Sequence, residues 1–263
     1  MIDKLIKIAT DEVGYIEKNS LADLDSKVKN AGNNNFTKYA QELKGYVGSP
    51  FVNGVQWCAT FVDWCFYKAY GSEKALSLLH LWTMSCGVLK DAFKAKGSYV
   101  KSPKAGDIVI FEWTDKGKLK RHTGLVYKVD SERIYTIEGN TNASANSVIE
   151  NGGGVFKKSY LKNNPKIDGY CRPNYVIIPK PTLKRGKTNP KDQVSLLQKI
   201  LNRLGYKDAE GKVLAVDGSF GLRTEEAVKA FQKAQQLAVD GSYGPRTAAT
   251  LRSVMEGIEY GQD

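Results

Sequence analysis

Histidine and cysteine are scarce in this chain of 263 residues, which contains only two histidines, His80 and His122, and four cysteines. The cysteines, at positions 58, 65, 86 and 171, lack the close pairs of zinc fingers and zinc ribbons. Cys58 and Cys65 are seven residues apart, about 10 Å along a helix axis, which is too far for a disulfide. We therefore expect free thiols, no metal and no cofactor.

Long apolar runs are also missing. The longest stretch without a charged residue, 45–62, contains Gly48, Pro50 and Asn53, so it cannot form a membrane-spanning helix. Charged residues such as Asp3 and Lys4 interrupt every apolar run near the first residue, and no signal-peptide pattern is present. We therefore expect a soluble protein that is synthesised in the cytoplasm.

Positive charge is in excess but is not concentrated. Lys and Arg number 39 against 28 Asp and Glu, a net charge of +11, of which residues 1–178 carry +7 and residues 179–263 carry +4. Such a surplus favours a polyanionic partner: a nucleic acid, an anionic membrane or an anionic cell wall. No block of five or six like charges occurs, and the densest cluster is 116–121. This weakens the case for a nucleic-acid-binding protein.

A change of pattern divides the chain in two. Residues 179–188 contain two prolines, a glycine and four cations, which predicts a linker. Before it, a strongly apolar helix over 57–70, closed by Gly71, precedes strands over 107–111, 124–129 and 133–138. Helices followed by an antiparallel sheet indicate an α+β domain over 1–178.

The part after the linker, 189–263, has helical patterns only and contains an internal repeat. VDGSFGLRT at 216–224 recurs as VDGSYGPRT at 239–247. Each copy combines an Asp-Gly turn with a threonine, Thr224 or Thr247, that we expect to cap the following helix. With a helix over 194–204, the pattern predicts a small all-α, three-helix domain.

Four residues could form a cysteine-hydrolase site. Cys58 stands at the expected start of a helix, where free N–H groups and the helix dipole stabilise a thiolate and an oxyanion. His122 begins a predicted strand, and Glu138 and Asn140 lie at the end of the next one, where either could orient the imidazole. The pattern alone also fits Cys58 and Cys65 as core residues, His80 as a structural histidine, and Glu138 and Asn140 as parts of a turn.

A resemblance favours the catalytic interpretation. Residues 57–65 (WCATFVDWC), 103–109 (PKAGDIV), 122–126 (HTGLV) and 137–140 (IEGN) resemble motifs of the CHAP family, the cysteine, histidine-dependent amidohydrolases and peptidases. Such domains have a papain-like fold and cleave peptidoglycan as amidases or cross-bridge endopeptidases. The resemblance implies that Cys58 is the nucleophile, His122 the base, Glu138 its orienter and Asn140 a fourth member. Gln56 is a candidate oxyanion donor, and Thr123 stands where the family usually has valine.

The second domain resembles the three-helix peptidoglycan-binding domain, on 196–198 (LLQ), 204–206 (LGY), 216–221 (VDGSFG), 227–232 (AVKAFQ) and 244–247 (GPRT). Candidate wall contacts are Asp217, Phe220, Asp240 and Tyr243. Each of these residues could equally serve the scaffold, because Asp-Gly turns build the fold whether or not they touch a ligand.

Together these features predict a modular cell-wall hydrolase that binds peptidoglycan of Gram-positive walls, with anionic wall polymers as further partners. We favour N-acetylmuramoyl-L-alanine amidase activity over a cross-bridge or stem endopeptidase. A non-catalytic wall-binding protein is the alternative from another class. The chain resembles a phage endolysin, which would be made in the host cytoplasm without a signal peptide and would act on the wall after release. No acidic loop with calcium-ligand spacing is present.

Overall fold

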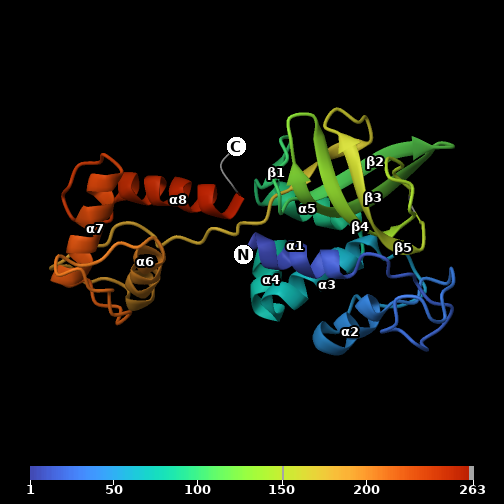
Figure 1. Cartoon of the computed structure of the whole chain (residues 1–263), viewed down its shortest axis with the longest axis horizontal. Helices are drawn as coiled ribbons and strands as arrows, with labels where there is room; N and C mark the ends of the chain where they lie inside the picture. The colour runs from blue at the N-terminus through green and yellow to red at the C-terminus, as the bar shows by residue number, and fades with distance from the viewer. Residues whose placement is uncertain (150, 261–263) are drawn as a thin grey trace. The chain divides into compact units, whose positions relative to one another are not determined.

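The structure is a computed structural model that describes residues 1–149 and 151–260. The chain forms two compact units, Met1–Tyr175 and Val176–Asp263 (Figure 1). The first unit thus ends just before the predicted boundary at residue 178. Within the described residues, no helix has both the length and the apolarity to span a membrane.

The first unit begins with helices and continues as a sheet, as the α+β prediction requires. Its helices are α1 (Ile2–Asp11), α2 (Lys38–Val47), α3 (Cys58–Tyr70), α4 (Ser72–Leu79) and α5 (Cys86–Ala95). Its strands are β1 (Tyr99–Val100), β2 (Ile108–Asp115), β3 (Lys118–Val129), β4 (Arg133–Thr141), β5 (Gly154–Leu161) and β6 (Ile167–Cys171). They form one antiparallel sheet in the order β1-β6-β2-β3-β4-β5.

The strand that carries His122 is longer than predicted. Strands β2 and β3 continue as a hairpin up to the pair Asp115 and Lys118. Lys116 and Gly117 turn the chain, both with positive φ (47° and 75°), as a two-residue hairpin turn demands. The densest cationic cluster therefore lies on this hairpin, and His122 lies inside β3 rather than at its start.

Helix α3 is the central helix of the first unit. It begins at Cys58 and ends at Gly71, whose φ of 76° suits a glycine, as predicted. Every residue from Cys58 to Phe66 is buried, so the helix has no solvent face at its N-terminal end. It contacts α1, α2 and α4 and also β3 and β4, and this packing fixes the direction of its first turn.

The second unit consists of α6 (Lys191–Arg203), α7 (Leu222–Ala234) and α8 (Pro245–Tyr260), which confirms the all-α, three-helix prediction. The segment predicted as a linker, 179–188, is part of this unit. Leu183 is buried in its core and pairs with Tyr243 through backbone hydrogen bonds of 3.1 and 2.9 Å. The division between the two units therefore precedes the predicted linker, and Leu183 within that segment packs with the second unit because it has a partner far along the chain.

Two equivalent glutamines hold the internal repeat together. The Gln198 amide donates to Asp217 Oδ1 (2.9 Å) and Thr224 Oγ1 (3.1 Å), and its oxygen accepts from the Gly218 N–H (3.1 Å). Gln232 repeats the pattern with Asp240, Thr247 and Gly241. Helices α7 and α8 begin two residues before these threonines. The prediction that the threonines are N-caps was therefore wrong, since their hydroxyls bind the buried glutamines instead.

The aromatic residues of the repeat belong to the core. Phe220 is 6% exposed and Tyr243 is 0% exposed, and both pack among the buried side chains of the three helices. The Tyr243 hydroxyl donates to the Pro179 carbonyl oxygen at 3.0 Å. The structure does not support the prediction that these two side chains contact the wall, because Phe220 has little exposed surface and Tyr243 has none.

We expect Gln232→Ala to lower the free energy of unfolding of the second unit by about 1–3 kcal/mol, because buried Thr247 and Gly241 lose their partner. Thermal unfolding monitored by circular dichroism measures the change. Lys233→Ala, on the exposed face of the same helix, is the matched control. Equal melting temperatures for the two variants would contradict the role of Gln232.

Candidate active site

Cys58 lies at the first position of α3 and is 5% exposed. The preceding residue, Trp57, makes no side-chain cap, so the N–H groups of the first turn have no side-chain acceptor there. The Trp57 indole donates to Glu17 Oε2 at 2.8 Å, which ties the start of the helix to the loop before α2. Glu17 is 1% exposed and anchors the residue before Cys58.

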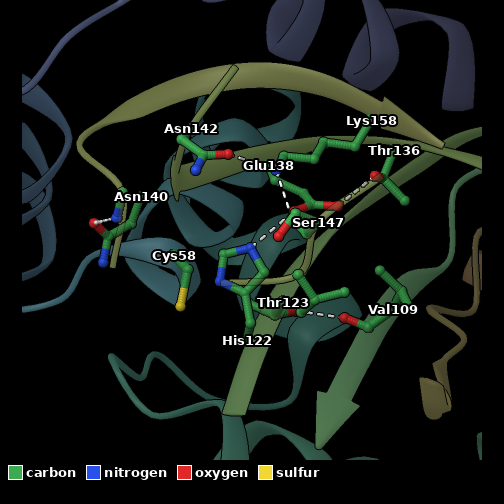
Figure 2. A network of polar contacts seen from close by, with 12 residues as sticks. Cys58, Val109, His122, Thr123, Thr136, Glu138, Asn140, Asn142, Ser147 and Lys158 are labelled. Carbon is green, nitrogen blue, oxygen red and sulfur yellow. Dashed lines mark hydrogen bonds and ion pairs between the residues drawn. The ribbon is translucent and has the colours of Figure 1, made fainter. Parts of the chain in front are cut away.

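His122 and Glu138 form a buried pair beside Cys58. Both side chains have no exposed surface, and His122 Nε2 lies 3.0 Å from Glu138 Oε2. His122 Nδ1 has no hydrogen-bond partner among the described residues. Figure 2 shows the imidazole between the two, with one nitrogen toward Glu138 and the other toward Cys58. The structure thus brings together the three residues that the sequence singled out.

Glu138 is held by two more side chains. The Thr136 hydroxyl donates to Oε1 at 2.5 Å, and the Tyr160 hydroxyl, from β5, donates to Oε2 at 3.3 Å. The ammonium of buried Lys158 donates to Asn142 Oδ1 and the Ser147 carbonyl oxygen (Figure 2). Burial lowers the pKa of Lys158, and the charge of Glu138 opposes that effect. Sequence reasoning missed these supporting residues.

Asn140 lies where β4 becomes irregular. The pairing with β5 shifts register between Glu138 and Thr141, and Asn140 has a left-handed φ of 56°. Its Oδ1 accepts from the Gly152 N–H at 3.4 Å. Its Nδ2 is buried and has no hydrogen-bond partner among the residues that the structure describes. The adjacent Gly139 packs against Trp57, the residue before α3, and against Phe61 of α3. Asn140 therefore lies near the helix start and has a donor to offer a ligand.

A second thiol adjoins Cys58. Cys86 Sγ lies 3.5 Å from Cys58 Sγ, at the start of α5. The hydrogen bond from Cys86, followed by the His122 imidazole and the Ala59 N–H, lowers the pKa of Cys58 well below the usual value despite burial. Burial disfavours the charged form of His122, but Cys58 and Glu138 outweigh it and raise the pKa of His122 to about 9. These shifts favour a thiolate–imidazolium pair at neutral pH.

Position 124 requires a glycine for a steric reason. A Cβ at Gly124 would lie 2.4 Å from Glu138 Cγ, so only glycine lets the glutamate lie across β3. Thr123, the departure from the family pattern, is buried and its hydroxyl donates to the Val109 carbonyl oxygen at 2.8 Å. The departure thus leaves the His122 backbone in a regular strand.

The remaining candidates lie apart from this cluster or at its edge. Gln56 is exposed, two residues before Cys58. His80 ends α4 with its ring 4.7 Å from that of Phe93, as a structural histidine would. Within the described residues, no group of three or more His, Cys, Asp or Glu is placed to hold a metal ion.

A cavity of about 300 Å³ is lined by residues of the loop before α2 and of the segment around β5. Gly152, which donates to Asn140, and Glu17, which holds Trp57, both line it. Asparagine side chains and two apolar residues complete the lining: Asn33, Asn142, Asn151, Ile16 and Phe156. The cavity thus offers asparagine amides and one carboxyl group, and it is linked to Asn140 through Gly152 and to Trp57 through Glu17.

In the second unit, Asp217 and Asp240 are exposed, but their carboxylates hold the turns through Gln198 and Gln232. Asp240 also lines a cavity of about 570 Å³. Side chains that the sequence analysis did not select complete this cavity, among them Gln236, Leu237, Pro245 and Arg246. The wall-contact prediction named turn residues, whereas the structure offers this concave surface as a place for a ligand.

We expect Gly124→Ala to displace Glu138 and to lower lytic activity at least tenfold, because the new methyl group overlaps Glu138 Cγ. The overlap should also cost roughly 1–3 kcal/mol of stability. Initial rates of wall clearing and thermal melts measure both effects. Gly45→Ala, exposed on α2 with open space around it, is the control. Unchanged activity in Gly124→Ala would contradict the steric argument.

Comparisons with known proteins agree with this geometry. A family model described as "CHAP domain" matches residues 50–140, and one described as "Putative peptidoglycan binding domain" matches residues 190–251. No curated protein sequence matches this one.

Among solved structures, a periplasmic domain of the EpsAB fusion protein of the Vibrio vulnificus type II secretion system is similar at 18% identity and a TM-score of 0.30. The match covers 56% of this chain and 57% of that one, and a similarity this low adds nothing to the assignment. The two family matches show a CHAP domain on the part of the chain that carries Cys58 and a peptidoglycan-binding domain on the part that carries the internal repeat, an arrangement consistent with a CHAP peptidoglycan hydrolase.

Proposed function

We propose that the protein hydrolyses amide bonds in peptidoglycan with Cys58 as a thiolate nucleophile. The observation that carries this proposal is the buried line of side chains in which Glu138 holds His122 and His122 faces Cys58 (Figure 2). The lowered pKa of Cys58 and the pKa of about 9 for His122 support an ion pair that exists before substrate arrives.

In this mechanism, the Cys58 thiolate attacks the amide carbonyl carbon, and the imidazolium of His122 donates its Nδ1 proton to the leaving nitrogen. The resulting thioester is hydrolysed by a water from which His122, now neutral, accepts a proton. Glu138 keeps the ring in orientation and stabilises its charged form in both steps. Buried Thr136 and Tyr160 hold Glu138 and leave it no free rotation.

The oxyanion of the tetrahedral intermediate needs donors near Cys58. The backbone N–H of Cys58, at the start of α3, is one donor. We propose Asn140 Nδ2 as the second, because it is buried, near the helix start and without a partner among the described residues. Gln56, the sequence-based candidate, is exposed and stays a prediction.

The bond that we favour is the one between N-acetylmuramic acid and L-alanine, which makes the enzyme an amidase. The asparagine-lined cavity that contains Glu17 and Gly152 supports this choice, since its amides match acetamido and hydroxyl groups of a sugar and its apolar side chains match a sugar ring face. Cleavage within the cross-bridge or stem by an endopeptidase would use the same Cys58, His122 and Glu138, and it is the alternative.

We propose the peptidoglycan of Gram-positive walls as the substrate and anionic wall polymers as a further partner, since both parts of the chain carry excess positive charge. The binding domain would raise the effective concentration of the catalytic domain at the wall. We place its wall contact at the cavity that Gln236 and Arg246 line. An endolysin that reaches the wall after release from the cytoplasm remains the predicted setting.

Clearing of a Gram-positive wall suspension tests the proposal. Cys58→Ala should lower the clearing rate by roughly a thousandfold or more, because the nucleophile is gone, while co-sedimentation with walls is unchanged. Cys65→Ala, equally buried on the same helix, should clear walls like the wild type. Mass spectrometry of the wild-type digest identifies the bond: a new amine on L-alanine means amidase, and a freed cross-bridge or stem terminus means endopeptidase.

Lysis by Cys58→Ala would remove this residue from the mechanism. Wild-type protein that binds walls and releases no fragments would instead be a non-catalytic wall-binding protein. Tight, salt-dependent DNA binding without wall binding would contradict both and would favour a nucleic-acid partner.

A further inference from the structure

The mechanism leaves one nucleophilic group beside the site without a chemical role. Cys86 is 7% exposed and Cys58 is 5% exposed, and they form a small buried cluster with Ala59. Their sulfur atoms are 3.5 Å apart. The two thiols are 28 residues apart in the chain, so the fold and not the local sequence places them together.

A chain of hydrogen bonds that begins on α3 holds Cys86 beside Cys58. Asp63, fully buried on α3, accepts from the Thr83 N–H at 2.9 Å. The Thr83 hydroxyl in turn accepts from the Ser85 N–H at 3.0 Å, and Ser85 caps α5 by accepting from the Val88 N–H. Both Cys58 and Cys86 therefore stand at the first position of a helix, and Asp63 ties the second helix start to the first helix.

We propose that Cys58 and Cys86 form an oxidative modification site, in which a disulfide between them blocks the nucleophile reversibly. The sulfurs need to approach from 3.5 Å to about 2.05 Å. This inference rests on the proposed function in one respect: loss of lysis follows only if Cys58 is the nucleophile.

The oxidant is hydrogen peroxide or a low-molecular-weight disulfide. With peroxide, the Cys58 thiolate attacks one oxygen, the O–O bond breaks, and Cys58 becomes a sulfenic acid while hydroxide leaves and is protonated to water. Cys86 then attacks the sulfenic sulfur, and the S–O bond breaks with release of a second water. Two thiols lose two electrons and two protons, and one peroxide becomes two waters.

The same pair would protect the enzyme from irreversible damage. A sulfenic acid that meets no thiol is oxidised further to a sulfinic acid, which ordinary reductants do not reverse. Cys86, already in contact, intercepts it first. The low pKa of Cys58 supports its role as the thiol that reacts with the oxidant.

The other two cysteines lack these properties and serve as internal controls. Burial raises the pKa of both Cys65 and Cys171, and since the hydrogen bond to Cys58 and burial also raise the pKa of Cys86, the contact with Cys58 is what singles Cys86 out. All four cysteines are free thiols in the structure, and the short sulfur–sulfur contact joins Cys58 and Cys86. Oxidation should therefore select one pair among the four.

Treatment of the full chain with a small excess of hydrogen peroxide tests the inference. After free thiols are blocked with iodoacetamide, non-reducing peptide mapping should show a Cys58–Cys86 cross-linked peptide, with Cys65 and Cys171 alkylated. Wall clearing should fall at least tenfold and should return after incubation with dithiothreitol. The Cys86→Ala variant should lose wall clearing relative to its own untreated rate, and dithiothreitol should not restore it. Its Cys58 should carry a sulfinic acid. Cys171→Ala should behave like the wild type.

Absence of the cross-linked peptide in oxidised wild type, or full recovery of Cys86→Ala by dithiothreitol, would overturn the inference. The peptide map is independent of activity. A Cys58–Cys86 disulfide in a protein that never clears walls, even when reduced, would support the modification site and overturn the proposed function. If peroxide abolishes wall clearing but no Cys58–Cys86 peptide forms, the modification site is overturned and the proposed function stands.

Discussion

The hydrogen bond between His122 Nε2 and Glu138 Oε2 joins two side chains that have no exposed surface, and the geometry of the site depends on it. Burial of an ion costs several kcal/mol unless partners compensate. Thr136 and Tyr160 supply hydrogen-bond donors to Glu138 from β4 and β5. With Nε2 bound in this way, Nδ1 is directed toward Cys58, and one interaction sets the tautomer, the orientation and the charge of the imidazole.

The start of α3 supplies the other half of the arrangement. Because the helix is buried on all sides over its first turns, its position is fixed by packing rather than by a cap. Glu17 holds Trp57 from one direction, and Gly139 lies against it from another. Cys58 is therefore a buried residue whose side chain lies beside the His122 imidazole, and the two interpretations of its sequence pattern do not exclude each other.

Local sequence located Cys58, His122 and Glu138 because a helix start and strand patterns are visible within a few residues, and family motifs then assigned the roles. Partners that come from other elements were not visible. Tyr160 comes from β5, which no pattern predicted, and Cys86 comes from a helix start fixed by a relay through α3. The same limit explains the error in the second unit, where distant glutamines bind the threonines that were expected to be caps.

The central claim is that Cys58 is a thiolate at neutral pH because His122 is charged beside it. The pH dependence of Cys58 alkylation by iodoacetamide, followed by mass spectrometry, tests this most directly. His122, with a pKa of about 9, stays protonated from about pH 6 to 8, so the wild-type rate should be flat there, while in His122→Ala it should rise with pH as for an ordinary thiol of pKa about 8.5. A wild-type rate that rises about tenfold per pH unit toward 8.5 would contradict the account.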